Sequence, residues 1–284
     1  MSIRNNEDRI GSPLAPDESL PPQALNQENS SMSFVIATEL VDLPSKGQFY
    51  PQGHPLHGVE SLEIKHMTAK DEDILVNKSY ITKGVVLDRL LQSVIIDKTV
   101  SVDDLIVGDK NALLIAARIS GYGAEYQTKV LCPSCGSISE NTFDLNDVGT
   151  NEHSRDIHEV TQTENGTFLL TLPASRVEVE VKPFTGRDEK SILEGNKMRK
   201  KRKLPELGMT DQMKKYIVSV NGSHSPKDIS DFVNVMPAID SKFLRTAYKD
   251  IIPNVDLAQH FECPECGYEQ EMEVPFTSDF FWPK

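Results

Sequence analysis

The sequence predicts an α+β protein in which two β-hairpins, far apart along the chain, each carry a pair of cysteines. Three observations support this fold class. Apolar and polar residues alternate in several short runs, such as 126–130, which indicates strands. Apolar residues recur at helical spacing in other runs, such as 85–94, which indicates amphipathic helices. The string Cys-Pro-x-Cys-Gly occurs twice, each time between two such alternating runs.

Composition narrows the class of protein. The 284 residues are 38% hydrophobic, which is enough for a substantial core. No stretch approaches the ~20 consecutive apolar residues of a membrane span, and the amino terminus lacks the basic-then-apolar order of a secretory signal. We therefore expect folding in the cytosol. The formal charge of -13 would on average repel nucleic acid and anionic membranes, so proteins are the expected partners.

The first part of the chain predicts a tail followed by an α+β domain. Residues 1–33 hold four prolines among polar side chains and few apolar residues to bury, which favours a disordered tail. A domain is expected over 34–145, and its first segment, 43–51, has too many turn formers for a regular element. We expect that segment to be a folded arm packed through Phe49 and Tyr50. Further elements expected in this domain are a strand from Ser61, helices at 68–76 and 85–94, a helix around 113–118 stopped by Gly121 and Gly123, and the first cysteine hairpin.

The second part predicts an inserted domain and then the second cysteine hairpin. Residues 146–256 contain two strand patterns that would form a half-buried hairpin, followed by four helical patterns. The final segment, 257–284, combines the second cysteine pair with an aromatic carboxyl end. The expected strands of the inserted domain are 167–172 and 177–181, and its expected helices are about 186–202, 210–220, 227–235 and 238–251.

The cysteines at the two hairpin tips predict a single metal site. Two residues between the members of each pair let both thiolates face one ion, and the glycine that follows accepts the turn. Four thiolates fill a tetrahedral shell, so we expect a split four-cysteine zinc ribbon with one structural zinc ion and no open position for catalysis. Disulfides or buried free cysteines are the alternative, which the reducing cytosol disfavours. The expected ligands are Cys132, Cys135, Cys263 and Cys266.

Several short strings, in the same order along the chain, resemble the baseplate hub subunit family of T4-type contractile-tailed phages. They are LPSKGQFYP at 43–51, EIKHMTAKDEDIL at 63–75, KGVVLDRLL at 83–91 and FTSDFFWP at 276–283. The resemblance implies a baseplate hub role, as a resident subunit or as a chaperone-like helper that leaves. It implies other baseplate or tail hub proteins as partners. The implied location is the host cytoplasm during assembly, and the virion tail baseplate for a subunit that stays.

Two other classes of function are weighed against this one. An enzyme finds little support, because the chain has no phosphate-binding Gly-rich loop, no nucleophile elbow and no His-x-x-x-His pair. We therefore expect no catalytic residue and no small-molecule substrate. A zinc-ribbon nucleic-acid-binding or regulatory protein is the alternative class, but the second knuckle is rich in glutamate, which makes nucleic acid an unlikely partner.

Two features suggest where partners bind. The aromatic residues Phe49, Tyr50, Phe280, Phe281 and Trp282 lie in short Pro-flanked segments, where they could anchor in a partner's pocket or pack on their own domain. The basic run 197–203 has six cations in seven residues. It could be an exposed helix end, a contact for an acidic protein surface, or a contact for nucleic acid.

Overall fold

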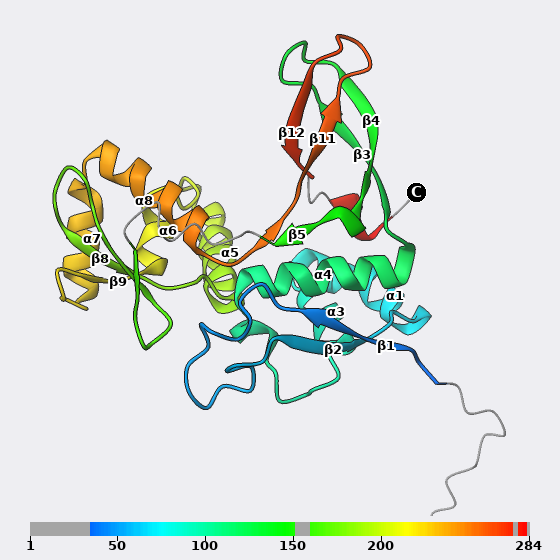
Figure 1. Cartoon of the computed structure of the whole chain (residues 1–284), viewed down its shortest axis with the longest axis horizontal. Helices are drawn as coiled ribbons and strands as arrows, with labels where there is room; N and C mark the ends of the chain where they lie inside the picture. Colours follow the sequence, from blue (N-terminus) through cyan, green and yellow to red (C-terminus); the bar gives the residue numbers. More distant parts are fainter. Residues whose placement is uncertain (1–34, 151–159, 275–277, 283–284) are drawn as a thin grey trace, which may run out of the picture. The chain divides into compact units, whose positions relative to one another are not determined.

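The computed structural model describes residues 35–150, 160–274 and 278–282. Every element below belongs to one unit, Ile36–Lys284, which is called the second unit. The predicted tail, 1–33, lies outside the described residues. The described part is mixed α+β, as predicted, and its sheets are small and antiparallel (Figure 1).

A two-stranded sheet and four α-helices form the first part of the fold. In the sheet, Val41 lies opposite Leu62. The strand predicted from Ser61 and the helices predicted at 68–76 and 85–94 are confirmed, whereas β1 and α2 are additions to the predicted elements. The elements are β1 (Thr38–Asp42), β2 (Ser61–Lys65), α1 (Ala69–Leu75), α2 (Lys78–Lys83), α3 (Val86–Val94), the short 3-10 helix η2 (Val102–Asp104) and α4 (Val107–Tyr122).

Helix α4 connects this part to the carboxyl end of the chain. It contacts α3, β1, the short strand β10 (Val255–Asp256) and the 3-10 helix η5 (Ser278–Phe281).

Helix α4 ends at Tyr122, and only Gly123 caps its end, with a φ of 84°. Gly121 lies inside the helix, so the predicted stop there is wrong. A Cβ at Gly121 would come within 2.9 Å of Met67 Sδ, so the glycine leaves room for this neighbour.

The arm at 43–51 is folded onto α4 by buried hydrogen bonds. Asp109 is fully buried and accepts bonds from Ser45 Oγ and Tyr50 Oη, both at 2.6 Å, and from the Ser45 backbone N–H at 2.9 Å. Tyr50 Oη in turn accepts a bond from the Ile106 backbone N–H at 3.1 Å. Because irregular backbone needs partners for its polar groups, these side chains replace the bonds that a regular element would supply.

The middle of the chain forms a four-stranded antiparallel sheet and four helices. The predicted hairpin at 167–172 and 177–181 is confirmed, as are the helices predicted at 186–202, 227–235 and 238–251. The strands, in sheet order, are β6 (Thr161–Gln162), β7 (Phe168–Thr171), β8 (Glu178–Val181) and β9 (Ile217–Val220). The helices are α5 (Gly186–Lys201), α6 (Met209–Tyr216), α7 (Pro226–Val235) and α8 (Ala238–Ile251).

The helix predicted at 210–220 is wrong in its second half. Helix α6 ends at Tyr216, and the chain continues directly into β9, where Val220 lies opposite Val179 of β8. The segment Ile-Val-Ser-Val is rich in β-branched residues, which lose side-chain freedom in a helix and pack well in a sheet. Pairing with β8 therefore outweighs the helical spacing of the apolar residues.

A single hydrophobic core runs through the second unit. Buried side chains from the arm, the first helices, the four-stranded sheet and both cysteine hairpins all belong to it. The proposed boundaries at 34–145, 146–256 and 257–284 remain a prediction within this one unit.

Candidate metal centre

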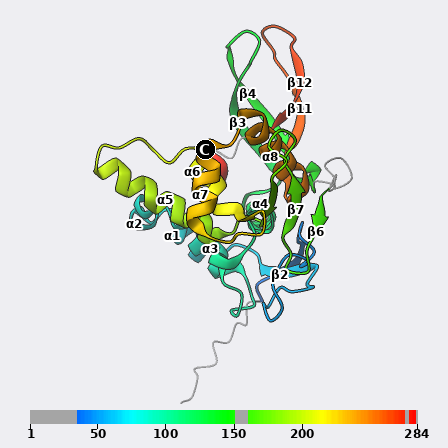
Figure 2. The same cartoon turned by 90° about the vertical axis from the view of Figure 1, so that its left-hand side faces the viewer.

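Two β-hairpins of the same design lie side by side and bring their cysteine tips together (Figures 1 and 2). The first is made by β3 (Glu125–Leu131) and β4 (Ile138–Asp144), with Leu131 opposite Ile138. The second is made by β11 (Ala258–Glu262) and β12 (Glu269–Glu273), with Glu262 opposite Glu269. Both predicted cysteine hairpins are confirmed.

The two tips share the same backbone geometry. In the first, the Cys132 N–H donates to the Ser137 carbonyl and the Gly136 N–H donates to the Cys132 carbonyl, both at 2.9 Å. The second repeats this at Cys263, whose N–H bonds the Tyr268 carbonyl and whose carbonyl accepts from Gly267, again at 2.9 Å. The glycines have φ of 71° and 66°. This left-handed conformation suits glycine, which explains the glycine of the repeated string.

The four sulfur atoms form a compact group. Cys132, Cys135, Cys263 and Cys266 place their Sγ atoms within 4.8 Å of one another. The distances Cys132 Sγ–Cys266 Sγ and Cys135 Sγ–Cys263 Sγ are both 3.8 Å. A disulfide needs ~2.05 Å, so these cysteines are free. The edge of a tetrahedron with metal–sulfur bonds of ~2.3 Å is ~3.8 Å, so the group has the size of a four-thiolate metal site.

Neighbouring groups set the acidity of the thiols. The Ser137 hydroxyl lies 3.5 Å from Cys263 Sγ and lowers the pKa of that thiol to about 6. For Cys266, a backbone hydrogen bond from Tyr268 lowers the pKa, but burial and the three other thiols outweigh it and raise the pKa to about 12. Four thiolates at this distance repel one another, so all four can be charged together only beside a cation.

Sequence reasoning did not identify the contact between Ser137 and the thiols. Its hydroxyl also lies 2.9 Å from Cys135 Sγ, so it contacts one thiol from each hairpin. The available signal was its position directly after the Cys-Pro-x-Cys-Gly string, where a hydroxyl can reach the sulfurs.

The bases of the hairpins are held by the core and by Arg118. Tyr126 and Phe143, which lie opposite each other at the base of the first hairpin, are almost completely buried, as is Phe261, which lies closer to the tip of the second. The guanidinium of Arg118 in α4 donates to the carbonyls of Gly123, Glu125 and Phe280, at 2.6, 3.1 and 2.7 Å. It therefore ties α4, the start of β3 and the carboxyl-terminal η5 together.

A pair of short strands also joins the segments beside the two hairpins, away from the cysteines. Strand β5 (Gly149–Thr150) follows the first hairpin and pairs with β10, which precedes the second, so that Thr150 lies opposite Val255. The two hairpin segments are thus joined at one strand pairing, β5 with β10, and at the cysteine cluster.

The aromatic residues predicted as partner contacts are mostly inside the protein. Phe49, Tyr50, Phe280 and Phe281 are each at most 6% exposed, and only Trp282 is half-buried. Phe49 packs on Phe168, with ring centroids 5.2 Å apart, and Phe280 packs edge-to-face on Tyr126 at 5.1 Å. This burial favours the alternative that these rings pack on their own domain.

Comparison with known proteins decides the family. A family model described as T4 bacteriophage base plate protein matches residues 36–282. The chain belongs to this family. Searches of curated proteins and of solved structures returned no match. A baseplate protein acts with other phage proteins in the tail, in agreement with the resemblance of the short strings.

No helix among residues 35–150, 160–274 and 278–282 is long and apolar enough to cross a bilayer.

The surface of the second hairpin in this baseplate protein is acidic. Five glutamates on and around its tip are exposed, and Lys249 pairs with only one of them, Glu273, at 2.6 Å. A ribbon that binds nucleic acid needs cations facing the phosphates. The hairpin therefore does not support the nucleic-acid alternative. The five glutamates are Glu262, Glu265, Glu269, Glu271 and Glu273.

Proposed function

We propose that the protein is a non-enzymatic component of the phage baseplate hub, either a resident subunit or an assembly factor, whose four cysteines bind one structural zinc ion. The observation that carries the zinc assignment is the group of four sulfurs, with two edges of 3.8 Å. Four thiolates fill the coordination shell of zinc and leave no position for a substrate, so the ion would stabilise structure only.

The position of the site explains why a bound ion would stabilise the fold. The two cysteine pairs are separated by residues 136–262, and each hairpin has only two strands. Isolated two-stranded hairpins are marginally stable in water. One ion bound by both tips would cross-link the hairpins after the intervening chain has folded, and so couple the two ends of the fold.

Metal analysis of protein purified without added metal tests the zinc assignment. We expect about one zinc per chain. Iron also binds tetrahedral thiolates, and it would be recognised by its visible absorption. Protein that is reduced, folded and free of metal would refute the assignment.

The hub role is tested by following the protein through tail assembly. Infection with a phage that cannot make this chain should stop at tails without a complete hub, and supplying the chain from a plasmid should restore infectivity. An antibody against the chain, applied to purified particles, separates a resident subunit from a helper that leaves. Normal tails formed without the chain would overturn the assignment.

A further inference from the structure

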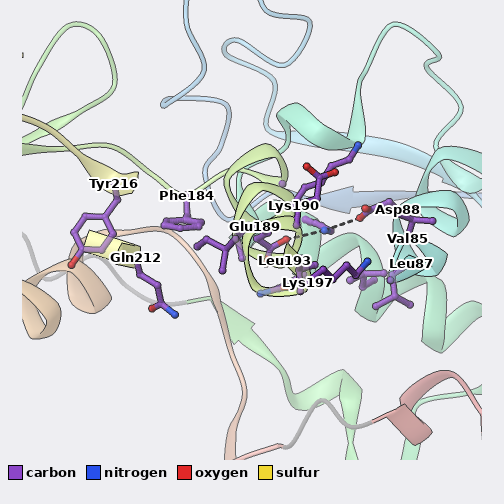
Figure 3. A pocket seen from close by; sticks show the side chains of 18 of the residues that line it. Val85, Leu87, Asp88, Phe184, Glu189, Lys190, Leu193, Lys197, Gln212 and Tyr216 are labelled. Atoms are coloured by element: carbon purple, nitrogen blue, oxygen red, sulfur yellow. Dashed lines mark hydrogen bonds and ion pairs between the residues drawn. The ribbon is translucent and has the colours of Figure 1, made fainter. Parts of the chain in front are cut away.

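A groove distinct from the cysteine site lies among the helices of the second unit. Its volume is about 950 Å³, and its lining comes from the end of α2, from α3, α4, α5, α6 and α8, and from adjoining loop residues. Figure 3 shows Leu193 and Lys197 of α5 extending toward Val85 and Leu87 at the start of α3, with Phe184 farther along the groove. The lining is predominantly apolar, although the groove is open to solvent.

Exposed apolar side chains gather along this groove. Leu193 is 49% exposed and Met209 59% exposed, and both line it. Beyond the groove, Met198 of α5 is 57% exposed and Leu204 is 48% exposed. Apolar exposure concentrated in one place is typical of a binding surface, and flexible methionines adapt well to a partner.

The charges around the groove are not balanced. Lys110 is neutralised within the groove, since its Nζ lies 2.8 Å from Asp88 and 2.9 Å from Glu189. Lys83, Lys197 and Arg245 also line the groove, and none of them has an acidic partner among the described residues. The basic run 197–203 begins at this edge. The lining as a whole holds five cations and three carboxylates, Glu194 among them, which is a local excess of positive charge in a chain of net charge -13.

A helix end alone does not account for these features. Cations near the carboxyl end of α5 suit its dipole, which explains Arg199, Lys200 and Lys201. The dipole gives no reason for exposed Leu193 and Met209 to face the same groove. Of the residues in α5 only Gly186 is buried, and seven of the sixteen are exposed, so this helix is only partly covered by the rest of the protein.

We propose that this groove binds an acidic segment, apolar on one face, of another baseplate protein. The apolar lining would receive the apolar face, while Lys83, Lys197 and Arg245 would pair with carboxylates at its edges. Nucleic acid fits less well, because its phosphates would meet the cations but leave the apolar floor uncovered. The groove shares no residue with the cysteine cluster, so this proposal and the zinc assignment can fail independently.

Binding of designed peptides to the full-length protein tests the proposal. The probe is a fluorescent amphipathic helix with a leucine face and a glutamate-rich polar face. Two matched peptides replace the glutamates by lysines or scramble the order so that no apolar face remains. We expect the acidic peptide to bind at least about tenfold more tightly than either of the two matched peptides. Fluorescence anisotropy measures the affinities. Equal binding of all three peptides, or no binding, would overturn the proposal.

Variants of the protein locate the site. Leu193→Ser should weaken binding of the acidic peptide about tenfold, whereas Ile239→Ser, at an exposed position of α8 outside the groove lining, should not. Lys197→Glu should weaken binding of the acidic peptide and strengthen binding of the lysine peptide. Lys227→Glu on α7 is the control. Thermal melts should change little, since all four side chains are exposed and the bond that Lys197→Glu removes, from Lys197 Nζ to the Lys83 carbonyl, is itself exposed. Unchanged binding in both groove variants, or equally tight binding of single-stranded DNA, would refute the assignment.

Discussion

Arg118 shows how one buried side chain can hold several elements of this fold. Only 2% of it is exposed, and its guanidinium donates to three carbonyls that belong to the end of α4, the start of β3 and η5. The guanidinium carbon of Arg118 also lies 5.4 Å from the centre of the Tyr122 ring. Neither periodicity nor composition distinguishes this arginine from a surface cation, because its partners are backbone atoms brought together by folding.

Replacing Arg118 with methionine should destabilise the protein by about 2–4 kcal/mol, because the carbonyls lose their donors in a buried site. Chemical denaturation would measure the loss. Arg89→Met is the matched control, since Arg89 is exposed and only contacts the ring of Tyr80. A loss in Arg118→Met no greater than that of the control would contradict this role.

Asp71 makes a pH-dependent contribution at the start of α1. Burial raises its pKa, but hydrogen bonds from Lys65, Ser93 and Thr68 outweigh burial and lower the pKa from 3.8 to about 2. Its contribution to stability is therefore present above pH ~3.8 and is lost as the pH falls through ~2. We expect it to amount to about 1–2 kcal/mol after solvent screening.

The Asp71→Asn variant should be less stable than the wild type at neutral pH, and the difference should shrink between pH 4 and 2. Denaturation of both proteins across this range gives the measurement. A difference that stays constant with pH would show that the carboxylate charge is not responsible.

At the scale of elements, the carboxyl-terminal segment closes the base of the cysteine hairpins. Phe281 is 2% exposed, and Phe280 packs against both Phe281 and Tyr126. The partly exposed Trp282 is the only one of the five predicted contact residues that is not fully buried, which leaves it available for a partner.

Alanine substitutions at Phe281 and Trp282 separate packing from partner binding. Phe281→Ala should lose about 3–5 kcal/mol of stability in the isolated protein, because it empties a filled core position. If Trp282 contacts a partner, Trp282→Ala should remain folded and bind metal but enter hub complexes poorly. A Phe281→Ala protein with wild-type stability would show that its burial contributes little.

At the scale of the whole molecule, the cysteine cluster connects segments that are distant in sequence. Cys132→Ser and Cys263→Ser should each lose the metal and destabilise the fold severely, since structural zinc sites carry ~10 kcal/mol or more of apparent free energy. Metal content and thermal melting are the measurements. Ser137→Ala is the control, because it removes a hydroxyl but no ligand, and should keep the metal. Wild-type melting in either cysteine variant would exclude a structural role.

Deleting residues 1–33 should leave the melting temperature nearly unchanged, because few of their side chains are apolar and burial could contribute little. Differential scanning calorimetry of the full and shortened chains would show this. A large decrease would mean that the segment packs on the second unit.

The sequence alone determined the features that depend on local spacing. The two cysteine pairs, both hairpins and most helices follow from short patterns, because a knuckle, a turn or an amphipathic face is defined within a few residues. The tertiary structure decided what depends on distant partners. It made 217–220 a strand by pairing it with β8, and it buried the aromatic residues expected at an interface. It also formed the groove from six helices, which no local pattern could reveal, since burial and cavities are set by the packing of segments far apart in the chain.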